Sequence, residues 1–101
     1  MGNRASVSFS KDGCESVTLF SHWGGREFQN RAKNLALELK KAANAPEIMN
    51  SPLGRLEPGT VMVEFIRQET KELDLVTGNY YLGKDSGSGD NSDNGHLIIR
   101  L

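Results

Sequence analysis

Residues 16–43 read SVTLFSHWGGREFQNRAKNLALELKKAA, and within this stretch the pattern changes from that of a strand to that of a helix. Residues 16–23 are rich in β-branched and aromatic side chains, which favour a β-strand. From residue 26 to about residue 44, apolar side chains recur at steps of three and four and form one face of an amphipathic helix. This face consists of Phe28, Ala32, Leu35, Leu39 and Ala42. The stretch therefore predicts a strand, a tight turn at Gly24-Gly25 and a helix.

A further strand is expected before this stretch. Val7 and Phe9 alternate with serines at positions 6, 8 and 10, which is the period-two pattern of a half-buried strand. The Asp12-Gly13 pair that follows is a typical hairpin turn. We therefore predict an antiparallel hairpin formed by the first two strands.

The second half of the chain is less regular. Residues 45–57 contain prolines, Gly54 and Asn50 and predict a connector. Residues 58–69 fit a helix or a strand equally well by pattern alone. Residues 79–83 and 96–101 predict two strands, which can pair as a second hairpin. The polar segment 84–94, between them, has no apolar side chain to anchor it and is expected to be mobile.

Four short motifs recur in a known group of proteins. They are NRAxVxF at residues 3–9, HWGG at 22–25, GNYYLG at 78–83 and DNG at 93–95. Together they resemble a group of small uncharacterised proteins found in bacterial genomes and prophages. That group carries no established activity, so the resemblance has an implication for the fold alone. It implies a helix for residues 58–69.

The sequence thus predicts a single α+β domain spanning residues 1–101. We expect an antiparallel sheet made from two β-hairpins and packed against one or two helices, in the order β-β-α-α-β-β. The order β-β-α-β-β-β is the alternative. A chain of 101 residues can bury one core, which agrees with a single domain.

Composition restricts the class of protein. No apolar run approaches the ~20 residues needed to span a bilayer, so no membrane association is expected. The net charge of −1 supplies no overall attraction for nucleic acid. Cys14 is the only cysteine, which excludes an internal disulfide and favours a cytoplasmic location.

The HWGG turn is the main candidate site. His22 could donate or carry a proton, Trp23 could stack on a ligand, and Gly24 and Gly25 allow close approach at a helix start. In the structural interpretation of the turn, the glycines serve backbone geometry and Trp23 caps the core. From its place between the strand and the helix, we predict that Trp23 is largely buried. Further candidate ligand-binding residues are Asn79, Asp93 and Asn94.

No catalytic set and no complete metal-ligand set is evident, and no cofactor is expected. Residues 90–95 match the first half of a calcium loop but lack the bidentate glutamate at its twelfth position. The first functional hypothesis is a small non-enzymatic binding or interaction module with a protein partner. The alternative is a small enzyme or metal-dependent site that uses His22 and His96. The second alternative is a nucleic-acid-binding accessory protein, acting through the basic residues of the first helix. These are Arg26, Lys33, Lys40 and Lys41.

Overall fold

The computed structural model describes residues 2–43, 45, 47–71 and 78–101. It contains the strands β1 (Ala5–Lys11), β2 (Cys14–Glu15), β3 (Thr18–Ser21), β4 (Tyr80–Gly83) and β5 (His96–Arg100), and the helices α1 (Gly25–Ala42) and α2 (Pro58–Thr70). The predicted α+β class is confirmed, and so is the order β-β-α-α-β-β apart from the additional short β2. Asn44, where the first helix was expected to end, lies outside the described residues.

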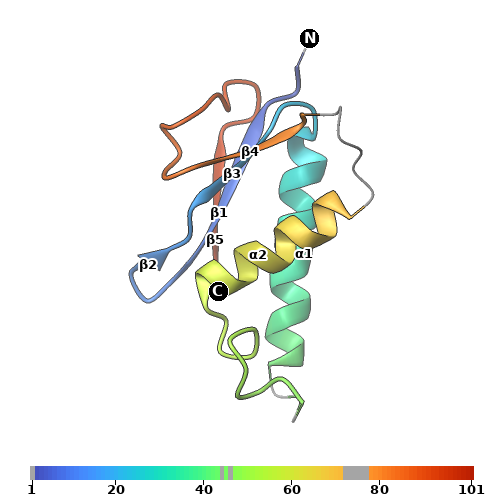
Figure 1. The fold of residues 1–101 in the computed structure, drawn as a ribbon, viewed down its shortest axis with the longest axis vertical. Helices are drawn as coiled ribbons and strands as arrows, with labels where there is room; N and C mark the ends of the chain where they lie inside the picture. The colour runs from blue at the N-terminus through green and yellow to red at the C-terminus, as the bar shows by residue number, and fades with distance from the viewer. Residues whose placement is uncertain (1, 44, 46, 72–77) are drawn as a thin grey trace.

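Strand β1 is the centre of the sheet (Figure 1). It pairs in antiparallel fashion with β2 and β3, and β3 pairs in the same way with β4. The β1–β2 turn is closed by Asp12 and Gly13, whose φ angles are 52° and 85°. Positive φ at both central residues is the geometry of the two-residue turns that suit hairpins, so this predicted turn is confirmed.

The last two strands do not form the predicted second hairpin. Strand β5 pairs in parallel with β1, and β4 lies at the other side of the sheet beside β3. Since β4 and β5 are both parallel to β1, residues 84–95 must cross the sheet from one edge to the other. Parallel strands require a connection of about a dozen residues, which explains the length of this segment. The sequence pattern specified both strands but not their partners.

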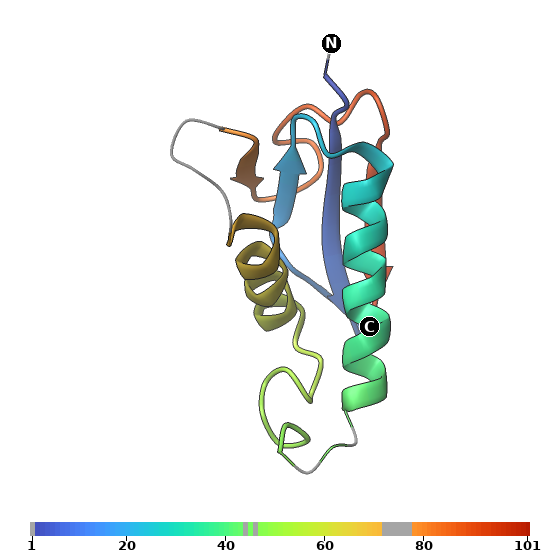
Figure 2. The same ribbon diagram turned by 90° about the vertical axis from the view of Figure 1, so that its right-hand side faces the viewer.

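Both helices cover one face of the sheet (Figure 2). In α1 the expected apolar face is buried at Phe28, Ala32 and Leu35 and partly buried at Leu39 and Ala42. In α2 the buried residues are Val61, Met62 and Phe65. Residues 58–69 are therefore helical, and the alternative order β-β-α-β-β-β is wrong. Pro58 occupies the first turn of α2, where its missing N–H costs no hydrogen bond.

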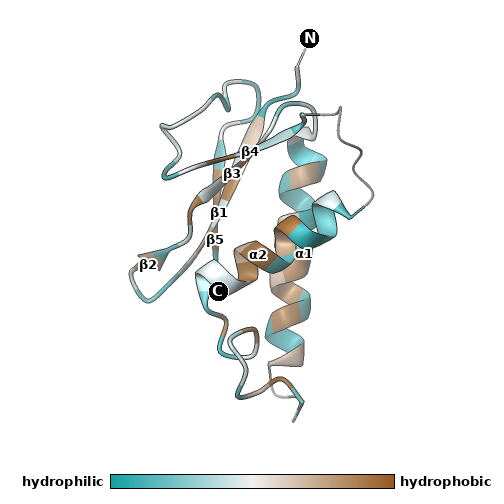
Figure 3. Ribbon diagram, in the orientation of Figure 1, coloured by the Kyte–Doolittle hydropathy of each residue, from teal (hydrophilic) through white to brown (hydrophobic). Residues whose placement is uncertain are grey.

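The outer face of the sheet is covered by the crossover, residues 84–95 (Figure 1). Although this segment is mostly hydrophilic (Figure 3), it leaves Ser6, Ser8 and Phe20 fully buried beneath it and its neighbours. The Asp90 amide donates to Tyr81 Oη at 2.8 Å, and a Cβ at Gly89 would lie only 2.6 Å from the Tyr81 ring. Hydrogen bonds and close glycine packing thus anchor the segment in place of apolar contacts, which the sequence did not indicate. Its mobility stays a prediction.

The central contact of the core predicts the effect of a substitution in α2. Phe65 is 1 % exposed, and its ring lies 5.9 Å from that of Phe9 and 5.5 Å from that of Phe28. Phe65→Ala should lower the free energy of unfolding by about 3–5 kcal/mol. Val63, on the opposite side of the same helix, is 66 % exposed, so Val63→Ala is the matched control. Urea denaturation should separate the two variants, and equal losses would contradict the assigned orientation of α2.

Candidate functional site

The turn between β3 and α1 is held on one side by Asn79. The Asn79 side-chain oxygen accepts hydrogen bonds from the Trp23 amide at 3.0 Å and from Ser21 Oγ at 3.1 Å. The Asn79 carbonyl accepts a third hydrogen bond from the His22 amide at 2.9 Å. Asn79 thus braces the turn rather than facing a ligand, and it continues the sheet pairing of β3 with β4.

The other side of the turn is held by the segment that precedes β1. The Asn3 amide donates to the His22 carbonyl, and the Asn3 carbonyl accepts from the Gly25 amide, both at 2.9 Å. Asn94 of the crossover donates to Asn3 Oδ1 at 2.6 Å. Asp93 accepts from the Arg4 amide at 2.9 Å and from Arg4 Nε at 3.1 Å. The structure therefore gathers the candidate residues in one region, but most of their polar groups are used within the protein.

The two glycines of the turn are required for different reasons, Gly25 by its backbone conformation and by packing, and Gly24 by packing alone. Gly25 has φ +57°, and a Cβ at this position would lie 2.1 Å from the Asn3 side-chain nitrogen. A Cβ at Gly24 would lie 2.6 Å from Phe28 Cβ. This packing agrees with the structural interpretation of the glycine pair. The Gly25 and Gly24 amides are also occupied, by Asn3 and by Ser21 Oγ.

Trp23 is the exception in this region, because its side chain does not join the core. The residue is 56 % exposed, so the expectation that Trp23 is largely buried is wrong. Helix α1 begins directly after the turn, and Phe28 fills the core position below Gly24. The turn directs Trp23 outward while its backbone stays fixed on both sides.

Trp23 forms the end of a row of rings. The centroid of the His22 ring lies 5.7 Å from that of Trp23 and 5.1 Å from that of Tyr81. Tyr81 in turn lies 4.8 Å from Phe20, which is buried beneath the crossover. The row therefore connects an exposed tryptophan with the packed outer face of the sheet. A shallow hollow of about 250 Å³ lies beside it, lined by Gly2, Arg4, His22 and Trp23.

The carboxylates of the calcium half-motif bind Arg4. Arg4 Nη1 lies 2.5 Å from Asp90, and Arg4 Nε lies 3.1 Å from Asp93. The hydrogen bond from the Arg4 amide is the main cause that lowers the pKa of Asp93, and the Ser92 amide does the same for Asp90. Arg4 thus already neutralises negative charge here, and the described residues contain no group of three or more His, Cys, Asp or Glu side chains able to hold a metal ion.

The structure separates the two histidines proposed for an enzyme or metal site. His22 directly follows β3 and contacts Trp23 and Tyr81, whereas His96 begins β5, beyond β1. The basic side chains proposed for nucleic-acid binding all lie exposed on α1. They are Arg26, Lys33, Lys40 and Lys41. Leu37 is 55 % exposed on the same helix.

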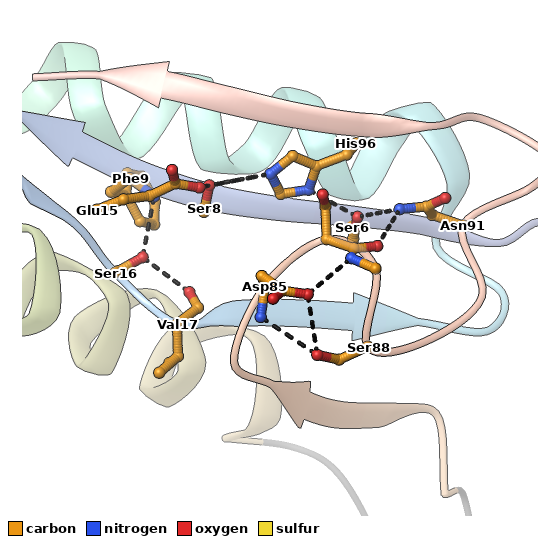
Figure 4. Close-up of polar contacts among 12 residues, drawn as sticks. Ser6, Ser8, Phe9, Glu15, Ser16, Val17, Asp85, Ser88, Asn91 and His96 are labelled. Carbon is orange, nitrogen blue, oxygen red and sulfur yellow. Dashed lines mark hydrogen bonds and ion pairs between the residues drawn. The ribbon is translucent and has the colours of Figure 1, made fainter.

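A second polar cluster was missed by sequence reasoning (Figure 4). His96 Nδ1 lies 2.8 Å from Ser6 Oγ, and His96 Nε2 lies 3.0 Å from Ser8 Oγ. Asn91 of the crossover and Glu15 of β2 complete the cluster. The alternation of serines with Val7 and Phe9 correctly places the serine hydroxyls on the face of β1 opposite the apolar core. No sequence signal indicated that this outer face is covered.

Comparison of the chain with protein-family models, with curated proteins and with solved structures finds no match. Within the described residues, neither helix is long and apolar enough to cross a membrane.

The contrast between Gly25 and Trp23 can be measured. Gly25→Ala should lower the free energy of unfolding by about 2 kcal/mol, because alanine resists positive φ and displaces Asn3. Trp23→Ala should change it by less than about 1 kcal/mol, as expected for an exposed side chain. Gly59→Ala in α2 is the matched glycine control, since a Cβ at Gly59 would meet nothing within 4 Å. A larger loss for Trp23→Ala than for Gly25→Ala would contradict this description of the turn.

Proposed function

We propose that this chain is a small non-enzymatic interaction module whose contact surface centres on Trp23. The observation that carries the proposal is that Trp23 is 56 % exposed although the backbone on both sides of it is fixed by hydrogen bonds. A tryptophan presented on a rigid turn loses little conformational entropy when a partner covers it. Tryptophan and arginine are also enriched among residues that dominate binding energy, and Arg4 lines the adjacent hollow.

A protein partner fits this surface better than a small ligand or a nucleic acid. The hollow of about 250 Å³ is shallow and smaller than the ~300–1,000 Å³ of typical ligand pockets. Arg4 is paired with both Asp90 and Asp93, so this patch offers no excess positive charge for phosphates. An exposed aromatic side chain beside polar groups is typical of a protein interface.

We further propose that the module acts in the cytoplasm. Cys14 is exposed and unpaired, and a free thiol of this kind is best maintained in a reducing compartment. The motifs at residues 3–9, 22–25, 78–83 and 93–95 support its assignment to the group of small bacterial and prophage proteins that they resemble.

The test compares partner capture by two exposed-residue variants. Trp23→Ala should reduce affinity for a captured partner by about 30-fold or more, as for a binding hot spot of ~2 kcal/mol. Leu37→Ala, which truncates a side chain exposed to 55 % on α1, should leave affinity unchanged. Isothermal titration of the purified partner gives both constants.

Trp23 is also the only tryptophan, so its fluorescence reports directly on the proposed surface. Binding should shift its emission to shorter wavelength as water is excluded. A partner that Trp23→Ala retains and Leu37→Ala loses would contradict the proposal. So would tight binding without any change in tryptophan emission.

A further inference from the structure

The cluster around His96 joins β1, β2, β5 and the crossover at the outer face of the sheet (Figure 4). Ser8 Oγ donates to Glu15 at 2.5 Å, and Asn91 Nδ2 donates to Ser6 Oγ at 2.9 Å. The imidazole of His96 lies between the two serines. Ser6 and Ser8 are fully buried, so their hydrogen bonds cannot be exchanged for water.

The hydrogen bonds of this cluster have a defined direction. An ionised Glu15 can only accept, so Ser8 gives its hydrogen to Glu15 and must accept from His96 Nε2. His96 Nε2 therefore carries the hydrogen of the neutral ring, and Nδ1 is left as an acceptor. Ser6 donates to that Nδ1, and its oxygen accepts from Asn91. In this arrangement, with His96 neutral, the hydroxyls of Ser6 and Ser8 and both ring nitrogens of His96 all have hydrogen-bond partners.

We propose that His96 is a pH-sensitive latch, which stabilises the closed position of residues 84–95 on the sheet while its ring is neutral. Protonation adds a hydrogen at Nδ1, where the hydrogen of Ser6 already points. Ser6 must then redirect its hydroxyl, although its own side chain is fully buried. The side-chain oxygen of Asn91 can accept the Ser6 hydroxyl hydrogen only if the side-chain amide of Asn91 rotates. This rotation breaks the hydrogen bonds that Asn91 Nδ2 donates to Ser6 Oγ and to the Ser86 carbonyl.

The charges around the ring act in opposite directions. Burial of His96 is the main cause that lowers its pKa, and Glu15, whose Oε2 lies 3.8 Å from Nε2, raises it. The other ionisable groups on the elements packed around this face come from the sheet and from the crossover. They are Arg4 before β1, Lys11 of β1, Cys14 of β2, Tyr80 and Tyr81 of β4, Lys84, Asp85, Asp90 and Asp93 of the crossover, and Arg100 of β5. Asp90 and Asp93 are both paired with Arg4, whose single positive charge offsets one of their two negative charges.

The sign of the effect follows from the lowered pKa. When His96 is released it regains an ordinary pKa of about 6.5, so the open form binds a proton more readily than the closed form. The contribution of His96 to the closed position of residues 84–95 is therefore fully present above about pH 6.5. It weakens as the pH falls from this value through the lower pKa that His96 has in the closed form.

The test is an NMR titration of the wild-type protein from pH 7.5 downward. The imidazole nitrogen shifts should identify the Nε2–H tautomer at high pH. Hydrogen-exchange protection of the Asp90 and Asn94 amides, corrected for intrinsic rates, reports closure because these amides donate to Tyr81 Oη and the Arg4 carbonyl. Their protection should fall about tenfold for each unit that separates the two pKa values of His96, while α1 amides stay protected.

Variants assign the effect to one group. His96→Gln should abolish the pH dependence, and His22→Gln should preserve it because His22 lies in the other site. Glu15→Gln should keep the dependence and move it to lower pH, since Glu15 raises the pKa of His96. If His96→Gln fails to fold, the wild-type titration still decides, because the midpoints of ring protonation and of lost protection must coincide.

Any of three results would overturn the latch. In the wild type, these are an Nδ1–H tautomer of His96 at pH 7.5 and unchanged hydrogen-exchange protection of residues 84–95 while the ring titrates. In the variants, the third is a pH dependence of this protection that survives in His96→Gln or disappears in His22→Gln or Glu15→Gln.

Discussion

The burial of the Ser6 and Ser8 hydroxyls is the constraint on which the rest of this structure depends. Strand β1 is covered on both faces, by the apolar core on one side and by polar groups on the other. A buried hydroxyl without a partner costs about 1–3 kcal/mol, so the outer face requires hydrogen-bonding groups at fixed positions. Asn91, His96 and Glu15 supply them from three separate segments. The arrangement of β2, β5 and the crossover around β1 satisfies this requirement.

The same crossover also determines the geometry of the candidate site. Its Asp93 and Asn94 hold Arg4 and Asn3, and Asn3 in turn binds the backbone of the turn at residues 22–25. The turn is therefore fixed from both of its sides although it lies outside the core. A rigid turn explains how Trp23 can remain exposed in one defined place. In this protein polar groups hold the turn of the site, and the side chain of Trp23 points to solvent.

Much of the fold could be predicted from local sequence patterns. The apolar face of α1 and the Asp12-Gly13 turn each have a signal within a few residues, and both are confirmed. The pairing of β5 with β1 could not be predicted, because periodicity identifies a strand but not its neighbour. The exposure of Trp23 was missed for a related reason. Hydrophobic character favours burial on average, whereas two glycines and Asn79 fix the direction of this turn.

The most direct test of this account is a double-mutant cycle between Ser6→Ala and Asn91→Ala, measured by urea denaturation. If the crossover is held on the sheet by the hydrogen bond between these side chains, the two substitutions should be coupled by about 1 kcal/mol. The double variant would then lose less stability than the two single variants together. Losses that add within about 0.3 kcal/mol would contradict the account, because the crossover would then be held without this contact.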